Sequence, residues 1–161
     1  MKFRKANKTD ISQLIDMRLA YLSEDYNGLT ADQSRMIAAQ LPGYFMEHLT
    51  RDLFAYVCVD SKLIVSTVFL LVMEKPANPS FLTGWTGTIL NVYTLPQYRK
   101  RGLAGSLMRL AMQEATCKKL SYLELKATQA GSSLYNKLGF IVYESNYISM
   151  KYQLTELGVD E

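Results

Sequence analysis

Apolar residues recur along this chain with two periods, and the change from one period to the other marks out the elements. Spacings of three and four predict a first helix over residues 11–22. A second helical pattern covers residues 30–49, with an interruption expected at Pro42-Gly43 because proline and glycine break helices. A third helix is expected to begin near Gly102 and to end by residues 118–119, where two lysines suit a helix C-terminus.

Strand-like runs account for most of the remaining apolar residues. In chain order they predict strands at 2–6, 53–59, 63–73, 88–94, 122–129, 140–143 and 147–152. Residues 60–62 read as a hairpin turn, and a short helix containing Tyr135 is expected before the last two strands. Asn7 and Asp10, three residues apart, form a capping-box-like start to the first helix. This order predicts a mixed α/β sheet with helices on both faces.

Length, charge and cysteine content narrow the class of protein. A chain of 161 residues that is 48% hydrophobic is expected to fold as one domain, and a net charge of +3 argues against a dedicated nucleic-acid binder. The first eight residues contain no secretory apolar run, and the longest apolar stretch, residues 63–73, is too short to span a bilayer. Cys58 and Cys117 read as reduced thiols of a cytoplasmic protein, and one histidine without a cysteine-histidine cluster predicts no metal site.

The most informative segment is the basic turn that leads from the strand at 88–94 into the third helix. It reads Arg99-Lys100-Arg101-Gly102-Leu103-Ala104-Gly105-Ser106. A strand, a small-residue turn and a helix N-terminus bring free amide groups and a positive dipole end to one spot, which favours a phosphate-bearing ligand. The turn lacks the P-loop pattern G-x-x-x-x-G-K-[ST] and the dinucleotide pattern G-x-G-x-x-G.

Two motifs carry a resemblance to a known family. Arg99, Gly102 and Ala104 match Q/R-x-x-G-x-G/A, and Tyr135 with Gly139-Phe140 matches Y-x-x-x-G-F downstream. The chain thus resembles the GNAT superfamily of acyl-CoA-dependent N-acyltransferases, in order from residue 1 to about 152 and most closely over 88–140. The resemblance implies a single GNAT-type α/β (α+β) domain over residues 1–153, with a polar tail at 154–161. Its mixed, mostly antiparallel sheet is expected to splay between the fourth and fifth strands.

The resemblance also implies acetyl-CoA as co-substrate and assigns roles to residues. The expected cofactor-binding residues are Val92, Tyr93, Thr94, Arg99, Lys100, Arg101, Gly102, Leu103, Ala104, Gly105 and Ser106. Main-chain amides at 101–106 would hold the pyrophosphate, Arg99 and Lys100 would reach the outer phosphates, and an N–H at 92–94 would stabilise the oxyanion. Tyr135 is expected at the coenzyme A sulfur, where a depressed pKa would help it to stabilise the leaving thiolate.

The general base and the acceptor pocket remain open. A primary amine is mostly protonated at pH 7, yet the strand at 88–94 carries no carboxylate, and Asn91 can position a water but cannot accept the proton. The candidate bases are Glu24, Asp25, Glu47 and His48, although the sequence favours an ordinary surface position for each of them. An acceptor pocket for a cationic amine would be lined by Glu24 and Asp25 together with five aromatic residues: Tyr21, Tyr26, Tyr44, Phe45 and Trp85. Ordinary packing is the alternative explanation of these residues, and the sequence favours it.

The sequence therefore predicts an N-acetyltransferase in which an amine attacks acetyl-CoA directly in a ternary complex. The acceptor is a small-molecule or peptide amine, with no nucleic-acid or membrane partner, and the family makes a homodimer plausible. The rival hypothesis is an acyl-CoA-binding sensor or regulatory module without turnover. The missing carboxylate favours the rival, whereas Tyr135 argues for the enzyme.

Overall fold

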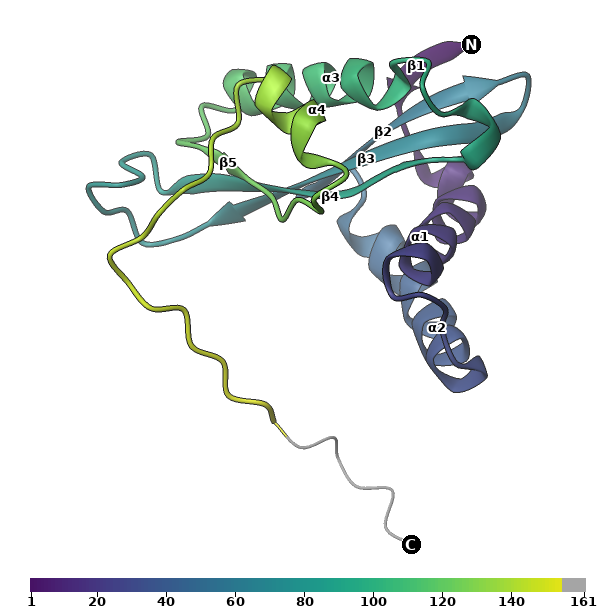
Figure 1. Ribbon diagram of the computed structural model, residues 1–161, viewed down its shortest axis with the longest axis horizontal. Coiled ribbons are helices and arrows are strands. Elements are labelled where there is room, and N and C mark those ends of the chain that lie inside the picture. Colours follow the sequence, from purple (N-terminus) through teal and green to yellow (C-terminus); the bar gives the residue numbers. More distant parts are fainter. Residues whose placement is uncertain (155–161) are drawn as a thin grey trace, which may run out of the picture.

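A five-stranded sheet separates two helical layers in the computed structural model of the protein, which describes residues 1–154 (Figure 1). The strands stand in chain order: β1 (Lys2–Lys5), β2 (Leu53–Asp60), β3 (Leu63–Glu74), β4 (Trp85–Thr94) and β5 (Leu123–Glu124). Neighbours are antiparallel from β1 to β4, whereas β4 and β5 are parallel. The sheet is therefore mixed and mostly antiparallel, as the sequence predicts.

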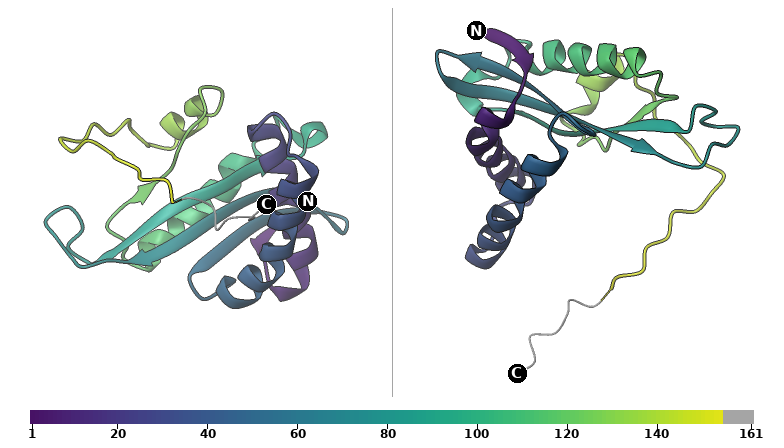
Figure 2. Two further views of the ribbon diagram at one scale, coloured as in Figure 1. Left: turned by 90° about the horizontal axis from the view of Figure 1, so that it is seen from below. Right: turned by 180° about the vertical axis from the view of Figure 1, so that it is seen from behind.

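The helices divide between the two faces of the sheet, as both figures show (Figures 1 and 2). On one face lie α1 (Ile11–Asp25) and α2 (Ala31–His48), and on the other α3 (Leu103–Cys117) and α4 (Ser132–Lys137). Two 3₁₀ turns, η1 (Lys8–Asp10) and η2 (Pro96–Tyr98), precede α1 and α3. Each face has its own apolar core, because alternate strand residues point to opposite sides.

The predicted start of the first helix and the predicted hairpin are both confirmed. The Asn7 side chain accepts a hydrogen bond from the Thr9 N–H, and the Asp10 carboxylate accepts one from the Asn7 N–H at 2.9 Å. Asp60 pairs with Leu63 across the turn between β2 and β3, where Ser61 has a φ of 57°. A positive φ is what a tight two-residue hairpin turn requires.

The predicted interruption of the second helix is wrong, because α2 continues through Pro42. Leu41 and Phe45 lie one turn apart in the core, where the Phe45 ring meets Phe69 of β3 edge to face. Pro42 itself lies on the exposed side of the helix. Burial of the apolar face therefore outweighs the hydrogen bond that a proline removes from a helix interior.

The fourth strand begins three residues earlier than predicted, at Trp85, so Gly87 lies inside β4 rather than at its entry. A Cβ added at Gly87 would stand 2.5 Å from Leu123 Cδ2 and 2.8 Å from Leu70 Cδ1. Glycine is required here because β4 and β5 approach so closely that no side chain fits between Leu70 and Leu123.

The C-terminal part of the sheet is smaller than predicted. The fifth strand has two residues in place of the eight expected at 122–129, and the strands expected at 140–143 and 147–152 do not form within the described residues. Residues 141–154 run away from the sheet as an exposed chain, with Tyr143 80% and Ile148 89% exposed (Figures 1 and 2). Apolar alternation alone does not make a strand, because a strand also needs a neighbour with which to pair.

Two further expectations concern the polar tail and the absence of a membrane-spanning segment. Apart from Leu154, the predicted polar tail at 154–161 lies outside the described residues. Within residues 1–154, no helix has both the length and the apolar character needed to cross a bilayer.

Candidate functional site

The N-terminus of α3 opens onto the basic turn without a capping side chain. Gly102 occupies the N-cap position with a φ of 74°, and Lys100 before it has a φ of 60°. Because the first amides of a helix have no acceptor within the helix, those of α3 are free to bind an anion. These free amides lie within the predicted anion site at residues 101–106, except that the Ser106 amide donates to the Gly102 carbonyl at 3.1 Å.

The three cations of the turn point in different directions. Arg99 donates from Nη2 to Glu24 of α1 at 2.6 Å and from Nε to the Thr94 carbonyl at 2.9 Å. Arg101 lies over the Tyr98 ring and donates to the Gln97 carbonyl, whereas Lys100 makes no ion pair with a described residue. Arg99 thus braces the turn against α1, and its contact with the outer phosphates stays a prediction.

The open edge of β4 is the second part of the site. Pairing between β4 and β5 stops at Thr88 and Glu124, so from Ile89 to Thr94 the β4 edge has no strand beside it among the described residues. Asn91 has a φ of 50° at an irregularity in the β3–β4 register. The splay predicted between the fourth and fifth strands is therefore present, and the expected oxyanion segment, Val92 to Thr94, lies along it.

Tyr135 lies on α4 and packs against the apolar core between the sheet and α3. Its side chain is half-buried and packs edge to face against Phe140. Burial raises the pKa of its phenol, and the nearby Tyr21 of α1 raises that pKa further. The raised pKa is the reverse of the expected depression, so Tyr135 stays a protonated hydrogen-bond donor.

Each of the four predicted bases already has a partner. The ion pair with Arg99 lowers the pKa of Glu24, and Asp25 accepts from the Tyr21 hydroxyl at 3.4 Å. Glu47 pairs with Arg51 in an exposed position. The ring of His48 stacks on Tyr44 with its Nδ1 2.9 Å from Asp52 Oδ1. Glu24 is therefore a poor proton acceptor, and the other three serve as local contacts of α1 and α2.

Glu124 is a carboxylate at the opening that the sequence prediction missed. It stands opposite Thr88 in the β4–β5 register, and its Oε1 accepts a hydrogen bond from the Thr88 hydroxyl at 3.3 Å. Leu123 and Leu125 pack into the core under α3, so Glu124 faces the side of α1 and α2. The alternation Leu123-Glu124-Leu125 was the signal that could have identified it.

The predicted aromatic pocket is divided by the structure. Phe45 is 1% exposed in the core, and Trp85 begins β4 at the end away from the turn. Tyr21 packs edge to face against Tyr93 beside the open edge, and Tyr44 stacks on His48. Tyr26 is exposed at the rim of a groove between α1 and α2. Of these five aromatic residues, Tyr21 is the one that contacts Tyr93 on the open edge of β4.

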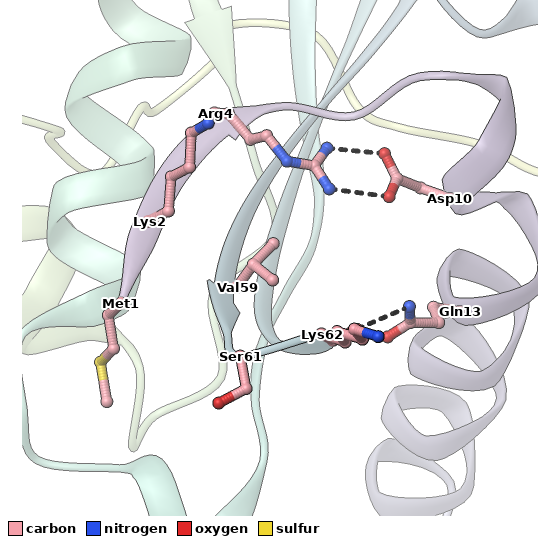
Figure 3. A pocket seen from close by; sticks show the side chains of 8 residues that line it. All are labelled: Met1, Lys2, Arg4, Asp10, Gln13, Val59, Ser61 and Lys62. Carbon is pink, nitrogen blue, oxygen red and sulfur yellow. Dashed lines mark hydrogen bonds and ion pairs between the residues drawn. The ribbon is translucent and has the colours of Figure 1, made fainter.

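A separate hollow of about 510 Å³ lies at the other edge of the sheet, between β1 and the start of α1 (Figure 3). Arg4 holds Asp10 there with two hydrogen bonds of 2.7 and 2.8 Å, and Gln13 donates to the Lys62 carbonyl. These polar groups satisfy one another and tie α1 to the sheet. Among residues 1–154, no three histidine, cysteine or carboxylate side chains gather as a metal site would require.

Comparison with known proteins agrees with this geometry. The family model of the acetyltransferase (GNAT) domain matches residues 51–142, more than half of the chain, whereas no curated protein sequence matches significantly. A predicted acetyltransferase from Clostridium acetobutylicum, solved with acetyl-CoA, is 26% identical over 93% of this chain and 95% of that one, with a TM-score of 0.82.

Two more distant structures share the fold. A GCN5-related N-acetyltransferase from Ralstonia eutropha JMP134 is 24% identical over 94% of this chain and 97% of that one, with a TM-score of 0.72. An aminoglycoside acetyltransferase from an uncultured soil metagenomic sample is 14% identical over 94% and 98%, with a TM-score of 0.69. The family model, together with the free α3 amides and the splayed β4 edge, shows that this chain belongs to the GNAT family of acyl-CoA-dependent acetyltransferases.

Proposed function

We propose that this protein is an N-acetyltransferase that moves the acetyl group of acetyl-CoA to a primary amine by direct attack in a ternary complex. The observation that carries the proposal is that the free α3 amides and the unpaired β4 edge occur together, with Tyr135 of α4 packed against the same apolar core as Val92 of that edge. The α3 amides would hold the pyrophosphate. The pantetheine amides would pair with the open edge of β4, as a strand would.

In this arrangement the thioester carbonyl lies against a backbone N–H of Val92 to Thr94. That N–H stabilises the negative charge that develops on the carbonyl oxygen as the amine attacks. The nitrogen lone pair forms the new C–N bond, the C–S bond breaks, and the sulfur leaves as a thiolate. Neither cysteine takes part, since Cys58 is buried within β2 and Cys117 ends α3 on the outside.

Tyr135 stabilises the leaving sulfur by donating a hydrogen bond. Full proton transfer from a free phenol, pKa about 10, to a thiolate, pKa about 8.5, is uphill by about 2 kcal/mol. The raised pKa of Tyr135 makes that transfer less favourable still. A hydrogen bond to the developing thiolate avoids this cost, and the proton lost by nitrogen as the amide forms neutralises the sulfur.

Glu124 supplies the carboxylate that β4 lacks. An ammonium acceptor must lose one proton before it can attack, and Glu124 on the acceptor face can take it directly or through a water beside Thr88. This assignment weakens the rival hypothesis of an acyl-CoA sensor without turnover, which rested on the absence of a carboxylate from β4. Glu24 is a poorer candidate for the general base, because it is already paired with Arg99.

The test is release of coenzyme A thiol from acetyl-CoA with a panel of primary amines, compared between the wild type and Glu124→Gln. The variant should keep its affinity for acetyl-CoA and lose about 100-fold in turnover at pH 7, with the loss shrinking at higher pH as the free amine becomes abundant. Glu144→Gln is the matched control. Binding of acetyl-CoA without thiol release for any amine would support the sensor in place of the enzyme.

A further inference from the structure

A groove of about 690 Å³ runs between α1 and α2 and leads toward the β4 site. Arg18 and Leu22 of α1, with Tyr26 just after its end, line it from one side, and Ile37 and Leu41 of α2 line it from the other. The two helices lie side by side below the sheet (Figures 1 and 2). Its walls are largely apolar, with Leu41 buried and Tyr26 exposed at the rim.

Arg18 stands where this groove meets the open edge of β4. Its Nη1 donates to Asn91 Oδ1 at 3.3 Å, and its guanidinium lies 5.6 Å from the centre of the Tyr21 ring. Asn91 is 3% exposed, and its amide nitrogen donates to Thr67 Oγ1 at 3.0 Å, so its oxygen is fixed toward Arg18. The structure therefore positions this guanidinium beside the bulge of β4.

No carboxylate of the described residues neutralises the charge of Arg18, whose guanidinium lies over the Tyr21 ring. Arg18 makes no ion pair with any carboxylate of residues 1–154, whereas Arg4, Arg35, Arg51 and Arg99 each do. One weak bond to a neutral amide leaves most of the five guanidinium N–H donors available, and their fork geometry matches a carboxylate. A cation in this position, next to an apolar groove, fits a ligand that carries both an anionic group and an apolar body.

We propose that the acceptor is a free α-amino acid with an apolar side chain, such as leucine or methionine. Its carboxylate pairs with Arg18, its side chain enters the groove between Leu22, Ile37 and Leu41, and its amine points to the open edge of β4. One carbon separates the amine from the carboxylate in an α-amino acid, so a carboxylate held beside Asn91 brings the nitrogen to the same bulge. This inference rests on the proposed acetyl transfer and names its substrate class.

The arrangement also distinguishes free amino acids from peptide N-termini. A peptide presents a neutral amide where the free amino acid has its carboxylate, and would leave the Arg18 charge without an anion. Within the amino acids, filling the groove with a leucine side chain favours leucine over glycine, because burying such a side chain contributes about 1.5–3 kcal/mol. That corresponds to a preference of about 10- to 100-fold.

The experiment compares kcat/KM for leucine, leucinamide, isopentylamine and glycine at saturating acetyl-CoA, from pH 7 to 9 to allow for their different amine pKa values. Leucine should exceed leucinamide and isopentylamine at least 10-fold. Arg18→Met should bring the ratio of kcat/KM for leucine to that for leucinamide close to one, mainly by raising KM for leucine. Arg18→Lys should retain part of the preference for leucine. Arg35→Met, at an exposed arginine of α2, should leave the ratio unchanged.

The possible failures are distinguishable. Thiol release with leucinamide or isopentylamine as good as with leucine would overturn this inference and leave the acetyltransferase standing. An Arg18→Met variant that binds acetyl-CoA normally and keeps the wild-type preference for leucine would also overturn it. Acetyl-CoA binding without thiol release from any of the four amines would overturn this inference alone, whereas no thiol release across the wider panel of primary amines would overturn the proposed function as well.

Discussion

Replacing glycine by alanine should lower the free energy of unfolding at Gly87 and raise it at Gly43. At Gly87 the added methyl would stand 2.5, 2.8 and 2.9 Å from the side chains of Leu123, Leu70 and Leu120, which is closer than carbon atoms pack. At Gly43, inside α2, no atom lies within 4 Å of the added carbon. Comparing the two variants therefore separates the cost of crowding from the intrinsic gain of replacing glycine.

The magnitudes follow from these two environments. Overpacking a filled core costs about 1–3 kcal/mol, and replacing glycine inside a helix or strand returns about 0.5–1 kcal/mol. Gly87→Ala should therefore lower the free energy of unfolding by about 1–2 kcal/mol. Gly43→Ala should raise it by about 0.5–1 kcal/mol. For a chain of this size these changes correspond to a fall in Tm of about 2–8 °C and a rise of about 1–4 °C.

Urea and thermal denaturation of the three proteins measure both effects. Since Leu123 precedes Glu124 on β5, displacing Leu123 in Gly87→Ala should also reduce acetyl transfer, whereas Gly43→Ala should not. If Gly87→Ala proves as stable as Gly43→Ala, the close packing of β4 against β5 described above is incorrect.

Three further predictions concern the turn, the acid limb of stability and the Thr88 contact. Gly102→Ala places a side chain at a φ of 74°, and calorimetry should show at least 10-fold weaker binding of acetyl-CoA. Gly139→Ala, at a φ of 92° and with equally open space around the added carbon, should cost stability alone. Arg4 lowers the pKa of Asp10, so the stabilisation by Asp10 is complete above the unfolded pKa of about 4 and is lost as pH falls through the lower folded value. Asp10→Asn should therefore flatten the acid limb of a stability–pH curve, and an unchanged limb would contradict the role given to this pair. Thr88→Val removes the hydroxyl that holds Glu124, so kcat should fall several-fold without a change in acetyl-CoA affinity; an unaltered kcat would show that this contact does not position the base.

Local sequence signals were sufficient where the residue type itself requires a particular backbone geometry. The capping pair Asn7 and Asp10, the turn at Ser61 and the glycine at 102 each require a particular backbone geometry, and the structure has that geometry at all three. The basic turn was recognised because its residue types suit a phosphate, whereas Tyr135 was recognised from its resemblance to the Y-x-x-x-G-F segment of the GNAT family.

Tertiary contacts decided what the sequence could not predict. Pro42 is tolerated because Phe45 packs against Phe69, a residue 24 positions further along the chain. Residues 140–152 alternate like strands, yet they find no partner among the described residues. The ion pair between Arg99 and Glu24 joins segments 75 residues apart, which no local pattern indicates. Glu124 became a candidate base only once β5 was placed beside Thr88.

The most direct test of the account is single-turnover acetyl transfer by the wild type and Tyr135→Phe, measured by thiol release with acetyl-CoA bound in advance. Removing a hydrogen bond to a charged group costs about 1.5–3 kcal/mol, so the account predicts a rate about 10- to 100-fold lower with an unchanged Kd for acetyl-CoA. Tyr143→Phe, at an exposed tyrosine of the C-terminal segment, should transfer at the wild-type rate. Equal rates for the wild type and Tyr135→Phe would contradict the claim that transfer takes place in the opening between β4 and β5.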